Sequence, residues 1–223
     1  RSDFSGAEKA WREQLTKTPT NWIAHYNLSL ALAQQNRWQE SAAHAATAFV
    51  QQPRDASIRW HLALTLEKAG YTPTALSEFI NPSPIHSVAR HFSPAVWQWI
   101  LIGAAALFAV AIALQLLRIY GHSSRALKPA AWSLGLVAFA VIGAAIASLR
   151  LYSPTGDARA ALVWKQSTLR SIPTEADTAQ KTTPLAAGSV AIIDHTFLGW
   201  SRLAFANGQT GWVRTEELRP LWR

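Results

Sequence analysis

Two long uninterrupted apolar runs dominate the pattern of the chain. They read "SPAVWQWILIGAAALFAVAIALQLL" and "PAAWSLGLVAFAVIGAAIASL", and neither contains a charged residue. A helix rising about 1.5 Å per residue needs roughly 20 apolar residues to cross a hydrocarbon core about 30 Å thick. Both runs reach that length and neither has a polar face. We therefore predict transmembrane helices at residues 93–118 and 129–151, joined by a short basic loop at 119–128.

Small residues recur at every fourth position within both runs. The two ridges are Ala105, Ala109 and Ala113, then Ala140, Ala144 and Ser148. Such ridges allow two membrane helices to approach closely, so they are candidates for the contact within the hairpin. The frequency of alanine in membrane helices is an equally good explanation.

The segment before the apolar runs has a helical pattern that repeats. Pro19 and Pro53 lie 34 residues apart, and a shift of 34 residues places Asn27 on His61 and Asn36 on Gly70. Small residues at crossing points let antiparallel helices touch, Asn or Gly supplies a left-handed turn residue, and Pro stops a helix. The pattern predicts a solenoid of helix pairs.

The tail after the apolar runs has a strand pattern instead. The short runs "AALVW", "SVAIIDH", "GWSRLAF" and "TGWVRTEEL" are separated by Pro and Gly, which is typical of a small all-β domain. Asn207 and Gly208 in "ANGQ" predict a hairpin turn between the last two of these strands.

The net charge of +8 is concentrated beside the apolar runs. Residues 1–91 contain nine Lys/Arg and seven Asp/Glu, residues 92–151 contain four and none, and residues 152–223 contain eight and six. This distribution indicates membrane orientation and does not favour a nucleic-acid partner. The loop between the two predicted transmembrane helices should lie in the cytoplasm, with its cationic residues Arg118, Arg125 and Lys128. Both termini would then face the periplasm or the cell exterior.

Catalytic and cofactor chemistry finds no support in the sequence. The chain has no cysteine, and it contains no HExxH, GxSxG or Walker-type motif. His25 lies on a predicted helix, where a surface role is commoner than metal ligation, and Asp194 and His195 have no nucleophile nearby. We therefore expect a protein that is not an enzyme and binds no cofactor.

The helical segment resembles the tetratricopeptide family, most clearly in "WIAHYNLSLALAQQNRWQESAAHAATAFVQQP". The resemblance implies repeats at 1–80, followed by a linker at 81–92. The repeats would be a partial one at 1–19, a full one at 20–53 and a second at 54–80. Because the first is partial, and the chain opens without Met, we expect further residues upstream of Arg1.

Tetratricopeptide repeats bind peptides or partner domains in a groove lined by the first helix of each repeat. The resemblance places five residues in that groove: Tyr26, Asn27, Gln34, Trp60 and His61. Asn27 and His61 would bond a peptide backbone, and Trp60 would cover an apolar side chain. The alternative is that Tyr26 and Trp60 only pack between neighbouring helices.

The tail resembles the bacterial SH3-like domain, through "TLRSIPTEA", "GWSRLAFANGQTGWV" and a closing "EEL". The domain would occupy residues 160–223 after a linker at 152–159. Such domains dock proteins or cell-wall peptides, and Trp200 and Trp212 are the candidate aromatic contacts. Trp212 could equally belong to the core.

The order of repeats, two spans and an SH3-like domain resembles the BatE family of Bat membrane proteins. That resemblance implies a non-catalytic scaffold or adaptor subunit of the bacterial cell envelope, located in the inner (cytoplasmic) membrane with both termini in the periplasm. Its partners would be von Willebrand factor A domain membrane proteins. It also implies association with a MoxR-type AAA+ ATPase and a link to oxygen or stress tolerance (aerotolerance). A membrane-anchored receptor for cell-wall peptides is the alternative function.

Overall fold

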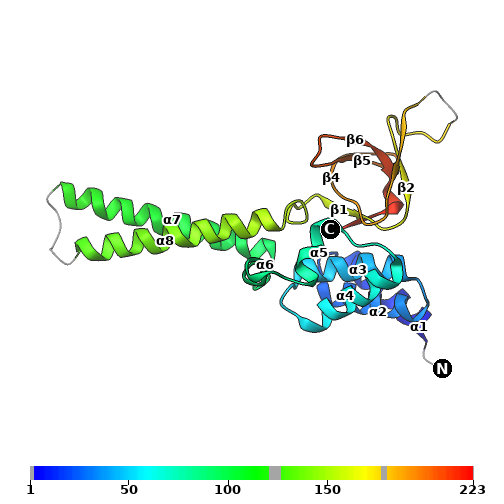
Figure 1. Cartoon of the computed structure of the whole chain (residues 1–223), viewed down its shortest axis with the longest axis horizontal. Coiled ribbons are helices and arrows are strands. Elements are labelled where there is room, and N and C mark those ends of the chain that lie inside the picture. The colour runs from blue at the N-terminus through cyan, green and yellow to red at the C-terminus, as the bar shows by residue number, and fades with distance from the viewer. Residues whose placement is uncertain (1–2, 121–126, 177–179, 223) are drawn as a thin grey trace. The chain divides into compact units, whose positions relative to one another are not determined.

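The computed structural model describes residues 3–120, 127–176 and 180–222. The backbone divides into two compact units, which are described separately. The first contains Arg1–Ser93 and Tyr152–Arg223, and the second is Pro94–Leu151. Helices and an antiparallel sheet make up the first unit, and two long helices make up the second (Figure 1). The prediction of a helical segment, two apolar helices and a C-terminal β-rich segment is confirmed at this level.

The turns predicted at Asn36 and Gly70 separate helices of the first unit. The helices of that unit are α1 (Phe4–Lys17), α2 (Trp22–Gln34), α3 (Trp38–Gln51), α4 (Ala56–Ala69), α5 (Thr74–Ile80) and α6 (Pro84–Ala89). The side chains of Asn21 and Asp55 cap α2 and α4 by accepting hydrogen bonds from backbone N–H groups of the first turn. Asn36 and Gly70 take the left-handed conformation in the turns after α2 and α4, with φ of 60° and 74°.

Helix α3 is the central element of the helical array. Every residue from Glu40 to Val50 is buried, because α2 and α4 both pack against this helix. Five of the buried residues are fully covered alanines: Ala42, Ala43, Ala45, Ala46 and Ala48. Small side chains over this length let neighbouring helices approach on several sides.

The strands form one seven-stranded sheet in the order β3-β2-β6-β5-β4-β1-β7, with each described pair antiparallel. Their bounds are β1 (Ala160–Val163), β2 (Ser167–Arg170), β3 (Thr182–Leu185), β4 (Val190–Phe197), β5 (Trp200–Ala204), β6 (Thr210–Arg214) and β7 (Leu218–Pro220). Leu203 and Val213 lie in its apolar core. Gly208, with φ of 80°, lies in the turn between β5 and β6, where the sequence predicted a hairpin.

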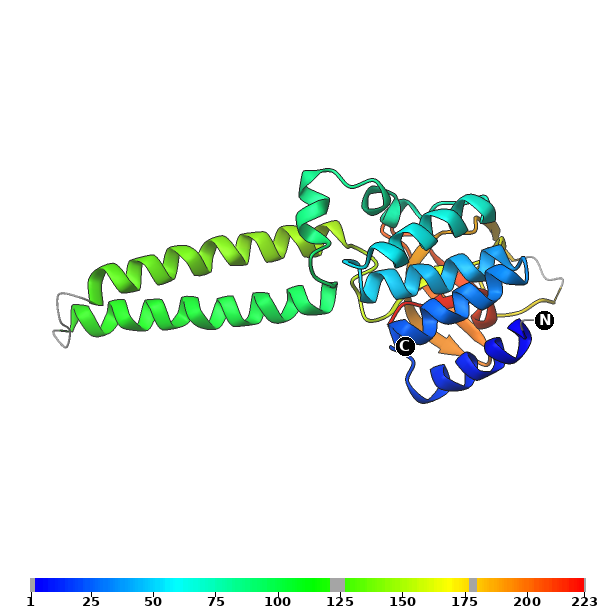
Figure 2. The ribbon, with the colours of Figure 1, turned by 90° about the horizontal axis from the view of Figure 1, so that it is seen from below.

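The sheet packs on the helical array within the first unit. Gln51, at the end of α3, donates a hydrogen bond of 3.0 Å from Nε2 to the carbonyl oxygen of Leu221, just after β7. The ring of Tyr152 stacks on that of Phe79 in α5, with centroids 4.5 Å apart, and its hydroxyl donates to the Phe92 carbonyl at 3.3 Å. Figure 2 shows the strands beside the helices. The chain therefore returns to the first unit at Tyr152.

Helix α6 lies inside the segment that the sequence analysis assigned to a linker. Pro84 is its first residue, a position where the missing backbone N–H and the fixed φ of proline are favourable. The Ser83 hydroxyl and the His86 Nδ1 atom lie 2.9 Å apart, and the His86 ring packs edge-on against Phe79. Local contacts thus make this stretch a short helix.

The second unit is a hairpin of α7 (Pro94–Ile119) and α8 (Leu127–Leu151), which lie side by side in both views (Figures 1 and 2). The stretches Pro94–Ile119 and Pro129–Leu151 are long and apolar enough to cross a membrane. That agrees with a protein of two spans.

The contact between α7 and α8 does not use the predicted ridges. Its buried small residues recur at seven-residue spacing: Ala104 and Ala111 on α7, with Ala131, Ala138 and Ala145 on α8. Of the predicted six, only Ser148 is buried, whereas Ala105, Ala109, Ala113, Ala140 and Ala144 are exposed. Two long helices that pack along their length meet at about every seventh residue, which explains the difference.

Candidate interaction surfaces

Trp60 lies on α4 and is one of two exposed residues among the five predicted for the groove, the other being Gln34. Trp60 is 68% exposed, and Ile23 on α2 is 47% exposed. Tyr26 is half-buried, and its ring meets that of His61 edge-on with centroids 5.6 Å apart. Of the remaining predicted residues, Asn27 is half-buried and Gln34, the last residue of α2, is exposed. Trp60 therefore presents a large aromatic surface to solvent.

His61 occupies a different environment from its neighbour Trp60. It is only 3% exposed, and its Nε2 lies 2.8 Å from the Ser29 hydroxyl. That hydroxyl is also within 3.0 Å of the Ser41 hydroxyl, so the three side chains connect α2, α3 and α4. Burial lowers the pKa of His61 to about 4, which leaves the ring neutral at pH 7. The geometry gives His61 a packing position between helices.

A polar cleft of about 190 Å³ lies on the sheet of the first unit. Its lining combines two guanidinium groups, two carboxylates, three further polar side chains and an indole. These residues are Gln166, Ser167, Thr168, Arg170, Glu175, Trp200, Arg214 and Glu217. Guanidinium groups beside hydroxyl donors can hold a carboxylate or another anionic group through charge-assisted hydrogen bonds.

Trp200 is the one aromatic residue in the lining of this cleft. Only 5% of the residue is exposed, and the guanidinium of Arg214 lies over its ring, 4.5 Å from the centroid. Arg214 in turn donates from Nε to Glu175 at 2.8 Å, and this hydrogen bond lowers the pKa of the Glu175 carboxyl. In the present arrangement Arg214 covers the indole.

Trp212 lies on the other strand face from the core residue Val213. The register places it opposite Arg170 of β2 and Arg202 of β5. Arg202 is opposite His195 of β4 and has an ion pair of 3.6 Å with Asp194. A row of alternating cationic and aromatic side chains therefore crosses the outer face of the sheet, and Trp212 is half-buried within it.

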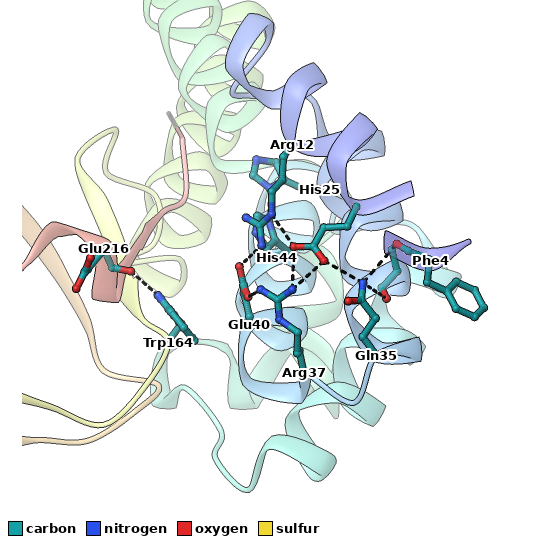
Figure 3. Close-up of polar contacts among 11 residues, drawn as sticks. Phe4, Arg12, His25, Gln35, Arg37, Glu40, His44, Trp164 and Glu216 are labelled. Atoms are coloured by element: carbon teal, nitrogen blue, oxygen red, sulfur yellow. Dashed lines mark hydrogen bonds and ion pairs between the residues drawn. The ribbon is translucent and has the colours of Figure 1, made fainter. Parts of the chain in front are cut away.

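A charged network joins α1 to the turn between α2 and α3 (Figure 3). Glu8 accepts hydrogen bonds of 2.8 Å from both Arg12 and Arg37, and both arginines also bind Glu40. Burial opposes the charge of Glu8, but hydrogen bonds from Arg12, Gln35 and Arg37 outweigh it and lower the pKa of Glu8 to about 2. The network fixes α1 on the array.

A buried pair of histidines lies beside that network. His25 and His44 approach with their Nδ1 atoms 2.9 Å apart, and Nε2 of His25 donates to the Pro19 carbonyl at 2.9 Å. Because a carbonyl only accepts, His25 carries its proton on Nε2 when neutral, and His44 must donate from Nδ1. Burial lowers the pKa of His25 to about 4 and that of His44 well below its ordinary value.

Arg219 of β7 is a further half-buried group that the sequence patterns did not single out. Burial lowers the pKa of its guanidinium, and its charge lowers the pKa of both His25 and His44. Nε of Arg219 and Nε2 of His44 are both buried without a hydrogen-bond partner among the described residues. Residues from the sheet and the array thus influence one another electrostatically.

The cationic residues predicted for the connecting loop are only partly described. Arg118 lies in the last turn of α7, whereas Arg125 and the side chain of Lys128 lie outside the described residues. Within the part of the chain that the structure describes, no three His, Asp or Glu side chains form a group able to hold a metal ion. No protein-family model, curated protein or solved structure matches this chain significantly.

Proposed function

We propose that the protein is a non-catalytic scaffold subunit of a bacterial envelope complex, held in the membrane by α7 and α8. Tetratricopeptide-like helices and an SH3-like sheet domain would dock its partners. The order of these parts resembles BatE, so the partners would be von Willebrand factor A domain membrane proteins of the Bat system. The complex would associate indirectly with a MoxR-type AAA+ ATPase and contribute to oxygen or stress tolerance.

The exposure of Trp60 carries this proposal. A tryptophan that is 68% exposed has a large apolar area in water, and tryptophan is enriched among the residues that dominate binding energy at interfaces. Gln34, also exposed, would supply a polar group at the rim, and half-buried Tyr26 and Asn27 would contribute the edge of the surface. The surface matches a docking role better than a catalytic one.

The polar cleft of the sheet domain would provide a second docking surface. The guanidinium of Arg214 now donates a hydrogen bond to the Glu175 carboxylate. An acidic side chain or a C-terminal carboxylate from a partner would bind Arg214 in place of Glu175. The sheet domain and the helical array share one compact unit, and two docking surfaces on one body raise the effective concentration of a multi-subunit partner.

The cleft also bears on the alternative of a cell-wall receptor. A receptor that stacks wall peptides on Trp200 needs an accessible indole face, yet Trp200 is 5% exposed and Arg214 covers its ring. Trp212, which is half-buried, lies between two arginines in register. We therefore favour a protein partner over a wall peptide.

The proposed topology places the scaffold outside the cytoplasm. Both ends of the chain would face the periplasm, and the connection from Arg118 to Lys128 would be the part exposed to the cytoplasm. A cytoplasmic ATPase would then reach this subunit through another protein or through that connection alone.

Purification from native membranes tests the proposal. The full chain would be extracted in mild detergent through a C-terminal tag and its partners identified by mass spectrometry, beside Trp60→Ala and the control Leu198→Ala. Leu198 is 81% exposed on the sheet domain, so its loss also removes exposed apolar area. Membrane proteins with von Willebrand factor A domains should co-purify with wild type and Leu198→Ala but not with Trp60→Ala. A lone chain, or one that carries only wall fragments, would refute the scaffold.

A further inference from the structure

Four basic side chains converge on one small cavity of the first unit. Arg54 lies in the turn between α3 and α4, Arg59 lies on α4, and Arg90 and His91 follow α6. Together they line a cavity of about 200 Å³. Arg54 and His91 are exposed, and Arg59 and Arg90 are half-buried. We call these four residues the basic cluster.

Carboxylates do not neutralise this cluster within the described part of the chain. None of the ion pairs there involves Arg54, Arg59 or Arg90, and the lining of the cavity contains no Asp or Glu. Asp55 is adjacent in sequence, but its Oδ1 accepts the backbone N–H groups of Ser57 and Ile58 as the cap of α4. Guanidinium groups gathered without counter-charges favour an anionic ligand.

Large apolar side chains are exposed next to the cluster in the sequence. Ile85 and Val88 on α6 are 55% and 56% exposed, and Phe92 is 42% exposed. Their spacing of three and then four residues is that of one face of a helical stretch, although α6 itself ends at Ala89. An apolar face flanked by cationic residues is typical of segments that lie in a membrane interface.

The chain also limits how far the cluster can lie from the first span. Arg90 precedes Pro94, the first residue of α7, and four residues of extended chain cover at most about 14 Å. The polar headgroup region on each side of a bilayer is roughly 5–7 Å thick. Arg90 and His91 are therefore within reach of lipid phosphate groups when α7 crosses the membrane.

We propose that the basic cluster binds the phosphate of an anionic phospholipid headgroup, while Ile85, Val88 and Phe92 enter the interface beside it. Each Arg near an anionic surface contributes about 1 kcal/mol, and bidentate contacts of guanidinium to phosphate fix the geometry. The lipid would hold the helical array at the bilayer surface. This inference is independent of the proposed docking function, because it involves neither Trp60 nor the polar cleft.

Binding of defined lipids to the full chain tests the cluster. Native mass spectrometry in detergent would count bound phosphatidylglycerol and, with the same acyl chains, phosphatidylcholine. The variant is Arg54→Gln with Arg90→Gln, and the control is Arg202→Gln on the sheet domain. We expect wild type and control to prefer phosphatidylglycerol. The double variant should bind it about 25-fold more weakly, since about 1 kcal/mol for each Arg is about fivefold.

Two results in this experiment would overturn the proposal. One is equal binding of phosphatidylglycerol by the double variant and the wild type. The other is displacement of the lipid by inorganic phosphate at equal concentration, which would identify a site for a free anion. Retention of the lipid in the presence of inorganic phosphate supports a lipid site that uses both the headgroup and the apolar residues.

A label on α6 tests membrane contact even if the double variant folds poorly. The chain has no cysteine, so Val88→Cys and the control Leu198→Cys each provide a single attachment point for an environment-sensitive fluorophore. In nanodiscs that contain phosphatidylglycerol, iodide should quench the label at position 88 several-fold less than the label at position 198. Equal quenching at both positions would show that α6 lies in water and would contradict the proposal.

Discussion

Gly188, in the turn before β4, lies directly against the ring of Tyr71, on the connection between α4 and α5. A Cβ atom at Gly188 would lie 2.7 Å from Cδ2 of Tyr71, closer than such atoms approach in folded proteins. Tyr71 also donates from its hydroxyl to the Gln39 carbonyl at 3.2 Å, and burial raises the pKa of that hydroxyl. The sheet and the helical array thus meet where no side chain larger than hydrogen fits.

Substitution of Gly188 should loosen this interface. Gly188 and Gly208 have similar φ of 86° and 80°, but a Cβ at Gly208 would meet nothing within 4 Å. Gly208→Ala should therefore cost only the backbone strain, about 1 kcal/mol, while Gly188→Ala should cost at least twice as much because its methyl also displaces Tyr71. Thermal unfolding in detergent measures the difference. Equal losses would show that the contact with Tyr71 is not tight.

The buried histidines predict that the helical array loses stability in acid. His25 and His61 are neutral in the folded protein with pKa values of about 4, whereas the unfolded chain takes up protons near pH 6.5. The unfolded state therefore binds more protons between these values, so stability is complete above about pH 7 and falls as the pH drops from 6.5 towards 4. Each of the two should cost about 2 kcal/mol at pH 5.

Helical circular dichroism during thermal unfolding between pH 7.5 and 5 checks this pH dependence. His61→Gln keeps a polar partner for Ser29 but removes the titration, so its melting temperature should fall less steeply with pH than that of wild type. His195→Gln is the matched control, since His195 is exposed on β4. A wild-type melting temperature that is constant between pH 7.5 and 5 would contradict the assignment of neutral buried rings.

The seven-residue seam of the hairpin predicts a contrast between two alanines on the same helix. Ala138 is 2% exposed at the contact with α7, and Ala140 is exposed on another face of α8. Ala138→Leu should destabilise the hairpin by about 1–3 kcal/mol through overpacking, and Ala140→Leu by less than about 0.5 kcal/mol. Unfolding by SDS in mixed micelles provides the measurement. A larger effect at Ala140 would show that the two helices pack through the ridge that the sequence predicted.

Removal of Trp60 should affect binding without affecting the fold. Because the side chain is largely exposed, Trp60→Ala should change the free energy of unfolding by less than about 0.5 kcal/mol. Phe49→Ala is a useful contrast, since Phe49 is fully buried and its loss should cost about 3–5 kcal/mol. Thermal unfolding of the two variants compares them. A large loss of stability in Trp60→Ala would identify Trp60 as a packing residue.

The sequence predicted elements well because their signals are local. Asn36 and Gly70 marked helix ends, Asn207 and Gly208 marked the hairpin, and the lengths of the apolar runs determined two long helices. Each of these signals depends on the conformational preferences of one or two residues, or on a simple count of apolar positions.

Contacts between elements were less predictable. The every-fourth ridge and the seven-residue seam both fit the same alanine-rich runs, and only the packing of α7 against α8 distinguishes them. The environment of His61 depends on Ser29 of a different helix, and the lowered pKa values of His25 and His44 depend in part on the charge of Arg219 in β7. The periodicity of apolar residues within one segment does not predict which residues of another segment it will contact.

Photo-crosslinking at position 60 tests the central claim most directly. The full chain would carry a benzophenone amino acid in place of Trp60, or of Leu198 as the control, and would be irradiated in native membranes. A scaffold that docks through the Trp60 surface predicts a crosslink from position 60 to one membrane protein with a von Willebrand factor A domain, and none from position 198. Absence of a protein crosslink at position 60, with the chain intact in the membrane, would contradict the account.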